Sequence, residues 1–140
     1  MKILIIGHSV EDHIHSSSNN EEIKPGGIYY TSSAMNIIKN NDDEIYLCTS
    51  IQKDNFYLFE QVYKNINSKY FQNVPQIPKV HLYLNDEKER TEKYENITNR
   101  LPIPFNDLNL FDGILINMIT GFDISLEDII KIRENYKGKI

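Results

Sequence analysis

Nine residues near the start of the chain, GHSVEDHIH from Gly7 to His15, hold three histidines and two carboxylates. All five are side chains that can bind a metal ion or move a proton. Their spacing matches no closed zinc pattern, and adjacent carboxylates in an extended segment point in opposite directions and cannot act as a pair. We therefore expect no metal site and no catalytic residue here, and we treat the histidines as polar neighbours of a pocket lip. The five side chains weighed are His8, Glu11, Asp12, His13 and His15.

Asp12 is the carboxylate in this segment that is best placed for binding. It lies five residues after Gly7, which closes an apolar run, and ligands of open α/β sheets bind beyond the carboxyl ends of such strands. An aspartate can accept hydrogen bonds from two hydroxyls at once, which suits a polyol. Gly26 and Gly27 form a turn that would let the backbone approach the same ligand closely. The residues alone thus favour Asp12, Gly26 and Gly27 as substrate contacts.

The segments around these residues alternate between strand and helix patterns. Continuous apolar runs are typical of strands buried on both faces of a parallel sheet, and the amphipathic segments between them are typical of covering helices. This alternation predicts an α/β fold with a central first strand. The predicted strands cover residues 2–6, 44–51 and 112–120, and the predicted helices cover residues 28–41, 54–67 and 125–138.

The helix patterns also predict caps and buried faces. We expect Thr31 or Ser32 to cap the first helix, Asp54 to cap the second, and Ser125 and Gly138 to begin and end the third. Helical spacing assigns the buried faces to Tyr30, Ala34, Ile37 and Ile38 in the first helix and to Phe56, Phe59, Val62, Tyr63 and Ile66 in the second.

The middle of the chain has a different character. Residues 79–85 and 90–97 form two strand patterns around a polar turn, and the second alternates charged side chains with others. Such strands are half exposed, so we place this hairpin outside the main sheet. At the other end, the predicted helix at 125–138 should lead into another strand, so Lys139 and Ile140 are expected to lie inside a βαβ unit.

The composition limits the classes of partner. The chain has 140 residues, 40% of them apolar, and a formal charge of −5. Without a stripe of basic residues, nucleic acid is not expected as a partner. The apolar run at residues 2–6 is too short for a signal peptide or a membrane span, which predicts a cytoplasmic protein without a membrane partner. The single cysteine, Cys48, lies in an apolar run and is expected to be a small buried hydrophobe.

The order of these pieces is more specific than any one of them. A strand ending IIGHSVED, a PGGIYY turn before the helix TSSAMNIIKN, the polar hairpin HLYLNDEKERTEKYEN, and a strand GILINMITG before a capped helix together resemble the PfkB (ribokinase-like) carbohydrate kinases. The similarity covers nearly the whole chain but only the N-terminal half of such a kinase. It implies a partial three-layer αβα, ribokinase-like fold, with residues 1–140 as a single incomplete domain and a small β lid at about residues 79–97.

The resemblance also implies roles for particular residues. In that family the first-loop aspartate and the glycine pair bind the hydroxyls of the sugar, and they match Asp12, Gly26 and Gly27 here. Further pocket candidates are Tyr30, Glu95, Asn96 and Asn117, although spacing alone makes Tyr30 a core residue, and Glu95 and Asn96 fit a solvated strand equally well.

The resemblance implies ATP and Mg²⁺ for the full-length family but no cofactor bound by this chain. In that family a D-T-x-G-A-G-D motif supplies the anion hole and the catalytic base, and this sequence contains no GxGD. We therefore expect the substrate-binding half of a sugar kinase that is inactive alone, with a sugar or related polyol as ligand. The family also suggests a homodimer through the lid. Two alternatives stay open: a catalytically dead sugar-binding or dimerising module, and an unrelated flavodoxin-like domain that binds a small molecule.

Overall fold

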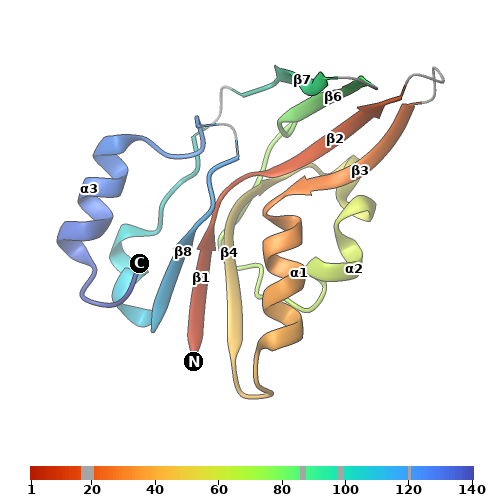
Figure 1. The fold of residues 1–140 in the computed structure, drawn as a ribbon. Coiled ribbons are helices and arrows are strands. Elements are labelled where there is room, and N and C mark those ends of the chain that lie inside the picture. The colour runs from red at the N-terminus through yellow and green to blue at the C-terminus, as the bar shows by residue number, and fades with distance from the viewer. Residues whose placement is uncertain (17–20, 86–87, 98–99, 120) are drawn as a thin grey trace.

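Two β-sheets organise the molecule. The computed structural model describes residues 1–16, 21–85, 88–97, 100–119 and 121–140. One sheet is parallel and lies between helices, and we call it the core sheet. The other is mixed, lies above it in Figure 1, and is called the outer sheet. The chain passes from the core sheet into the outer sheet where β1 leads into β2 (Figure 1).

The first strand is central in the core sheet, as its apolar run predicts. β1 pairs in parallel with β4 and with β8, so that Ile5 lies opposite Leu47 on one side and Leu115 on the other. β5 continues the sheet beyond β4. The strand order is β5-β4-β1-β8, with bounds Phe71–Asn73, Glu44–Ile51, Lys2–Ile6 and Gly113–Ile116.

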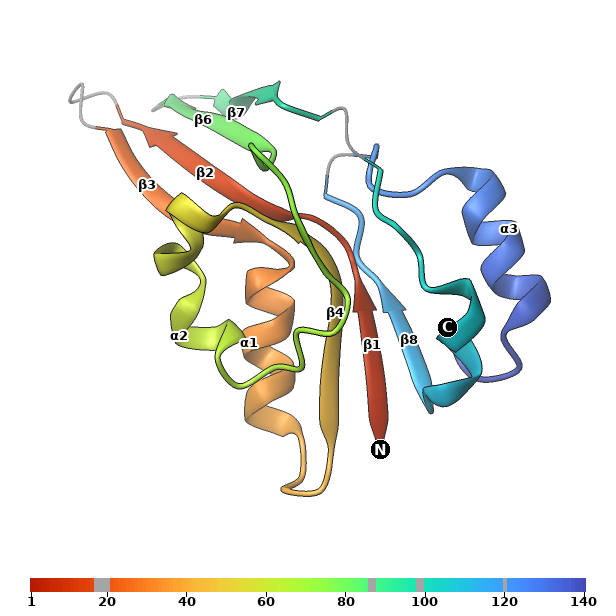
Figure 2. The same ribbon diagram turned by 180° about the vertical axis from the view of Figure 1, so that it is seen from behind.

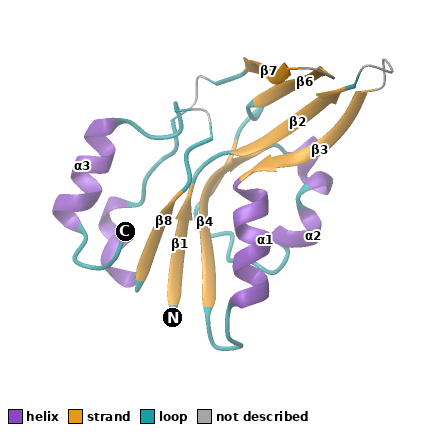
Figure 3. Ribbon diagram, viewed as in Figure 1, coloured by secondary structure: helices purple, strands orange, loops and turns teal. Residues whose placement is uncertain are grey.

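Alternate side chains of β1 enter two separate apolar clusters. Leu4 and Ile6 pack in a cluster that contains Ile132, whereas Ile5 packs in a cluster that contains Ile28. Because side chains alternate across a strand, this is the burial on both faces that the continuous apolar run predicts. Helix α3 covers one face and helices α1 and α2 cover the other (Figure 3). The predicted three-layer α/β arrangement is therefore confirmed.

Within the described residues, three α-helices and two 3₁₀ segments cover the core sheet. In α3 the Ser125 side chain accepts the Asp128 N–H and the Asp128 carboxylate receives the Ser125 N–H, which is the predicted cap in a capping box. The predicted end at Gly138 is wrong, because the helix ends at Asn135 and Tyr136 is its C-cap. The bounds are Ile28–Ile38 for α1, Lys53–Leu58 for η1, Glu60–Tyr63 for α2, Phe105–Leu110 for η2 and Leu126–Asn135 for α3.

The predicted cap of α1 is wrong. The helix begins directly after Gly27, and no side chain caps it. Ser32 lies one turn inside the helix, where its hydroxyl donates to the Ile28 carbonyl at 2.7 Å. The Gly-Gly turn therefore starts the helix earlier than the hydroxyl residues indicated.

The predicted buried face of α1 is also wrong. Ile28 and Ser32 are buried, whereas Ile37 and Ile38 are 80% and 71% exposed. The packing of Ile28 in the core cluster, and not helical spacing alone, sets which side of α1 faces the sheet, and apolar residues near the end of the helix project outward. Tyr30, at 57% exposure, is not a core residue.

The second predicted helix forms only in part. Residues 53–58 are a 3₁₀ segment that begins after Gln52 without a side-chain cap, so Asp54 is not the predicted N-cap. Only one turn of α-helix, α2, follows. The apolar spacing is nevertheless informative, since Phe59, Val62, Tyr63 and Ile66 are all buried.

The outer sheet contains the predicted hairpin and two strands that the sequence did not indicate. β6 and β7 are antiparallel and lie outside the core sheet, as expected. β2 pairs with β6 in parallel and with β3 in antiparallel fashion, so GHSVEDHIH is mainly a strand and not a loop. The order is β3-β2-β6-β7, with bounds Glu21–Gly27, Ser9–His15, Lys79–Asn85 and Lys88–Glu95 (Figure 2).

The expectations for Lys139 and Cys48 agree with the structure. Lys139 forms a parallel bridge with Gly113, at the place where a further strand was expected. Cys48 is fully buried, and burial raises the pKa of its thiol to about 12. None of the helices in the described ranges combines the length and apolar composition that a bilayer crossing requires.

Candidate functional site

Asp12 and Gly26 lie in direct contact across two strands. In the β2–β3 pair, Asp12 is opposite Lys24 and Val10 is opposite Gly26, so Asp12 is a diagonal neighbour of Gly26. A Cβ atom added to Gly26 would overlap the Asp12 carboxylate. Glycine at this position therefore leaves the space that the carboxylate occupies. The structure brings together two of the three residues that the sequence favoured.

The Asp12 carboxylate is half buried and lacks local donors. Within the described part of the chain, no group donates a hydrogen bond to it. Burial raises its pKa to about 6, and of the nearby charges Arg90 lowers the pKa while Glu92 raises it. Such a carboxylate has acceptor positions to offer a ligand.

Gly27 fixes the start of α1. Its φ of 64° lies in the left-handed region, which a side chain disfavours. A Cβ there would also overlap the His8 carbonyl, which accepts the Ile28 N–H at 3.1 Å. Gly27 thus lets α1 begin directly against the strand that carries Asp12. The Ile28 N–H is already used and is not a free donor for a ligand.

Asn117 lies at the carboxyl edge of the core sheet. It follows β8, and its backbone N–H donates to the Ile6 carbonyl at 2.9 Å. Its side-chain Nδ2 donates to Thr31 Oγ1 of α1. A Cβ on Gly7 would overlap the Asn117 carbonyl, so the chain after β1 and the chain after β8 are in close contact. Asn117 therefore lies at the sheet edge where the sequence placed it, and its side chain is hydrogen-bonded to the start of α1.

The remaining pocket candidates do not converge on Asp12. Tyr30 is exposed and packs edge-on against Tyr29. Asn96 has a φ of 58°, and its Nδ2 donates to the Ile77 carbonyl at 3.5 Å. Glu95 on β7 pairs with Lys79 on β6, and these paired residues are one position along the strands from those that pair with Asp12. Because successive side chains of a strand alternate between the two faces of a sheet, Glu95 lies on the opposite face from Asp12.

His8 has a structural role in the interior of the protein and is not the polar neighbour of a pocket lip that the sequence suggested. It is fully buried, and its Nε2 lies 3.5 Å from Asp123 Oδ1. The other oxygen of Asp123 accepts the Ile119 N–H at 2.7 Å. Strand β1 and the chain after β8 are therefore joined by a buried polar pair. No local pattern indicates Asp123 as the partner, because 115 positions separate the two residues.

The other histidines form a cluster with residues that sequence analysis missed. His13 is hydrogen-bonded to Glu21, and His15 to His81. Alternation along β2 places His13 and His15 on one face, which the sequence could show. The pairing of β2 with β6, which adds His81, depends on contacts over 66 positions. This cluster faces away from Asp12.

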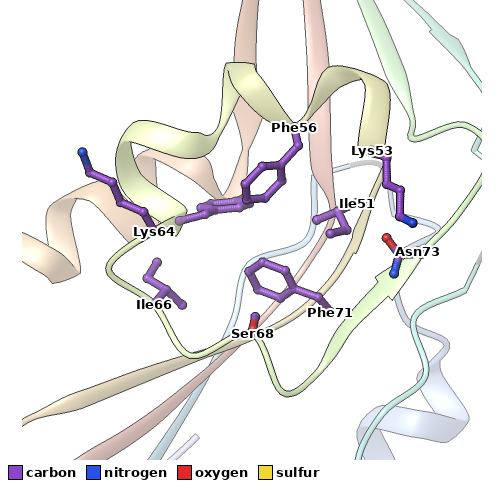
Figure 4. A pocket seen from close by; sticks show the side chains of 9 residues that line it. Ile51, Lys53, Phe56, Lys64, Ile66, Ser68, Phe71 and Asn73 are labelled. Atoms are coloured by element: carbon purple, nitrogen blue, oxygen red, sulfur yellow. The ribbon is translucent and has the colours of Figure 1, made fainter.

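An apolar pocket of about 480 Å³ opens between β4, β5 and the η1–α2 segment. Phe56 and Phe71 project into it, and Lys53 and Lys64 lie at its rim (Figure 4). Its walls contain none of the predicted sugar contacts. It is a hollow in the helix layer, separate from the Asp12 site.

Several of the solved structures that resemble the chain are named as kinases. The ribokinase of Thermotoga maritima aligns over 97% of this chain with a TM-score of 0.69 and 16% identity. A pyrophosphate-dependent kinase of the ribokinase family, complexed with a pyrophosphate analogue and myo-inositol, aligns over 98% with a TM-score of 0.64 and 18% identity. A nucleoside kinase of Methanocaldococcus jannaschii aligns over 99% with a TM-score of 0.56 and 17% identity.

The chain matches only part of each of these proteins. It covers 50% of the Thermotoga ribokinase, 47% of the inositol-bound kinase and 59% of the nucleoside kinase. No protein-family model and no curated protein matches the sequence. The predicted ribokinase-like fold is confirmed, and the chain corresponds to about half of a ribokinase-type structure.

Proposed function

We propose that the chain is the substrate-binding part of a PfkB-like, ATP-dependent carbohydrate kinase. The observation that carries the proposal is the half-buried Asp12 carboxylate, which lies against Gly26 and receives no hydrogen bond from the described residues. It belongs to a chain whose fold is that of ribokinase-type kinases. The proposed substrate contacts are Asp12, Gly26 and Gly27, with Asn117 at the edge of the same region.

A sugar would supply the hydrogen-bond donors that the Asp12 carboxylate lacks. Neighbouring hydroxyls of a polyol can both donate to one ionised carboxylate, and hydrogen bonds to a charged group are about twice as strong as neutral ones. Partial burial strengthens such bonds because the carboxylate is not fully hydrated before binding. The absence of a side chain at Gly26 leaves the space that the carboxylate occupies. Asp12 would then orient the sugar without taking part in proton transfer.

Phosphoryl transfer requires groups that this sequence does not offer. It needs neutralised phosphates, backbone donors for the developing charge and a carboxylate that takes the hydroxyl proton. The chain contains neither a GxGD nor a Walker glycine loop, and Asp123 at the sheet edge is buried against His8. The residues present do not fit ATP and Mg²⁺, so we assign no catalytic residue and expect no kinase activity from this chain alone.

The test is direct binding of candidate sugars to the 140-residue chain. Isothermal titration or two-dimensional NMR would compare D-ribose, myo-inositol and adenosine, chosen from the ligands and names of the similar structures. We expect one of them to bind, with a loss of at least tenfold in D12N. The exposed carboxylate Asp42 provides the control D42N, which should bind as the wild type does. Equal affinity in D12N and wild type would refute the assignment of Asp12.

A dimerising module is the second candidate. Strands β3 and β7 form the two edges of the outer sheet, and such edges can pair with another chain. Ile23 and Tyr94 on these strands are 44% and 38% exposed. Light scattering with and without sugar distinguishes the two: a dimer that forms without any sugar, together with no sugar binding, would favour the module. Under either proposal we place the protein in the cytoplasm.

A further inference from the structure

The face of the outer sheet that points away from Asp12 carries three neighbouring histidines. His13 and His81 are cross-strand partners in β2 and β6, with ring centroids 4.8 Å apart. His15 stacks on His81 at 5.2 Å and on Tyr83 at 4.5 Å. Imidazole rings from two strands therefore gather on one polar surface. The sugar proposal makes no use of them.

His13 is held between two carboxylates. Its Nε2 lies 2.6 Å from Glu11 Oε1, and its Nδ1 lies 2.6 Å from Glu21 Oε1. Glu11 is buried, and Lys79 at 3.1 Å and Asn55 also bind its carboxylate.

Glu11, which is ion-paired with Lys79, fixes the orientation of the His13 ring. A carboxylate can only accept, so the proton of His13 that it binds lies on Nε2. The nitrogen that faces Glu21 is then Nδ1. A histidine that donates one N–H to a carboxylate and turns its other nitrogen outward is the arrangement found at protein metal sites.

His81 has ligand capacity that its surroundings do not use. Its side chain is 17% exposed, and its Nε2 is buried without a hydrogen bond from the described residues, 3.6 Å from a Glu95 oxygen. Its Nδ1 lies 2.9 Å from His15 Nε2. Two N–H groups cannot face each other at that distance, so at least one of these two nitrogens presents a lone pair.

We propose that His13, Glu21 and His81 bind a zinc-like divalent transition-metal ion. One ligand atom from each residue lies within 4.8 Å of the other two. Zinc bonds of about 2.0–2.2 Å place tetrahedral ligands roughly 3.3 Å apart, a distance that small side-chain rotations reach. The ion takes the place of the proton that His13 Nδ1 shares with Glu21, and this proton is released to solvent as the two metal–ligand bonds form. It joins three strands, because these ligands belong to β2, β3 and β6.

The donor set and the exposure of the site determine which ion it takes. Two imidazoles with one carboxylate suit zinc and its neighbours, whereas Ca²⁺ and Mg²⁺ require oxygen ligands. Glu21 is 47% exposed, which gives the ion a path from solvent. His15 Nε2, 3.9 Å from the Glu21 oxygen, is the nearest candidate for a fourth ligand. The site lies on the opposite face from Asp12 and does not depend on the sugar proposal.

The experiment titrates metal ions into the chain prepared without a histidine tag. We expect one Zn²⁺ per chain by calorimetry, no comparable binding of Mg²⁺, and Co²⁺ absorption bands typical of nitrogen and oxygen ligands. E21Q should weaken Zn²⁺ binding at least tenfold. Its matched control is E22Q, because Glu22 is the next residue on β3, pairs with Lys24 at 3.0 Å and lies on the other face.

A second variant separates this site from adventitious binding. H81Q should also lose at least tenfold in affinity and change the Co²⁺ spectrum, with folding checked by circular dichroism. Should H81Q fail to fold, the comparison of E21Q with E22Q still decides the matter. The proposal is overturned if wild type takes up no stoichiometric zinc, or if E21Q binds zinc as tightly as E22Q does.

Discussion

At the scale of single residues, the raised pKa of Asp12 predicts that its ionised carboxylate favours sugar binding but lowers the stability of the fold. Burial lifts the pKa to about 6, above its value in the unfolded chain. The folded state then holds more protons between about pH 4 and pH 6, so Asp12 reduces stability as pH rises through that window. After discounting for its exposed part, the cost at neutral pH is about 1 kcal/mol.

We therefore expect D12N to raise the free energy of unfolding by about 1 kcal/mol at pH 7, with the gain disappearing toward pH 4. Urea denaturation of both proteins at several pH values measures this. The same variant should bind sugar less well, because the amide is a weaker acceptor than the carboxylate. If D12N destabilised the fold equally at every pH, the carboxylate would not be the desolvated group described here.

Gly26 gives a second prediction at this scale. G26A introduces a Cβ into the space of the Asp12 carboxylate and should cost about 1–3 kcal/mol. In a D12A background the obstacle is gone, so the cost of G26A should fall by more than half. G113A is the matched control, because nothing lies within 4 Å of a Cβ at Gly113. Denaturation of the four cycle members tests this; equal costs of G26A in both backgrounds would contradict the contact.

At the scale of elements, the capping box of α3 predicts the effect of a single hydroxyl. S125A removes the acceptor for the Asp128 N–H and should lower the free energy of unfolding by about 1 kcal/mol. S33A, inside α1, is the control: alanine favours the helix interior, so the change should be neutral or slightly stabilising. Thermal unfolding of both variants provides the measurement. A cap variant as stable as the wild type would show that tertiary packing alone holds α3.

The elements also show how far the sequence determined the fold. Strands β1, β4 and β8 were predicted because burial on both faces leaves a continuous apolar run. The cap at Ser125 was predicted because its hydrogen bonds are local. Strands β2 and β3 were missed because they are rich in polar residues and because they form strands only through pairing with other strands of the outer sheet. The buried face of α1 was wrong because tertiary contacts of Ile28, and not helical spacing alone, set its rotation.

The residues of the candidate site also fall into those that the sequence could predict and those that it could not. Asp12 and the glycine pair were chosen from their place after an apolar run, and the structure puts Asp12 against Gly26. Glu95 was chosen with them but lies on the other face, since the phase of β7 depends on its register with β6. His81 joins His13 only through the parallel pairing of β2 with β6, which no local pattern shows.

At the scale of the whole molecule, a polar seam joins the two sheets. The Ser9 hydroxyl lies 2.8 Å from both Thr49 Oγ1 and the Tyr63 hydroxyl, and the Ser9 N–H donates to Thr49 at 2.9 Å. All three residues are buried. The start of β2 is therefore fixed to the core sheet, whereas the far ends of the outer strands depend on contacts within their own sheet. The proposed zinc site lies in that outer part.

Hydrogen exchange should reveal this division. We expect amides of β1, buried on both faces, to exchange slowest, and those of the edge strands β3 and β7 to exchange fastest. Zinc should slow exchange in β2, β3 and β6, because its ligands join these strands, and should leave β7 and the ends of the core sheet nearly unchanged. Mass spectrometry of peptides with and without Zn²⁺ measures both effects. Uniform slowing across the chain would mean that the ion stabilises the fold globally, and slowing confined to other segments would place the ion elsewhere.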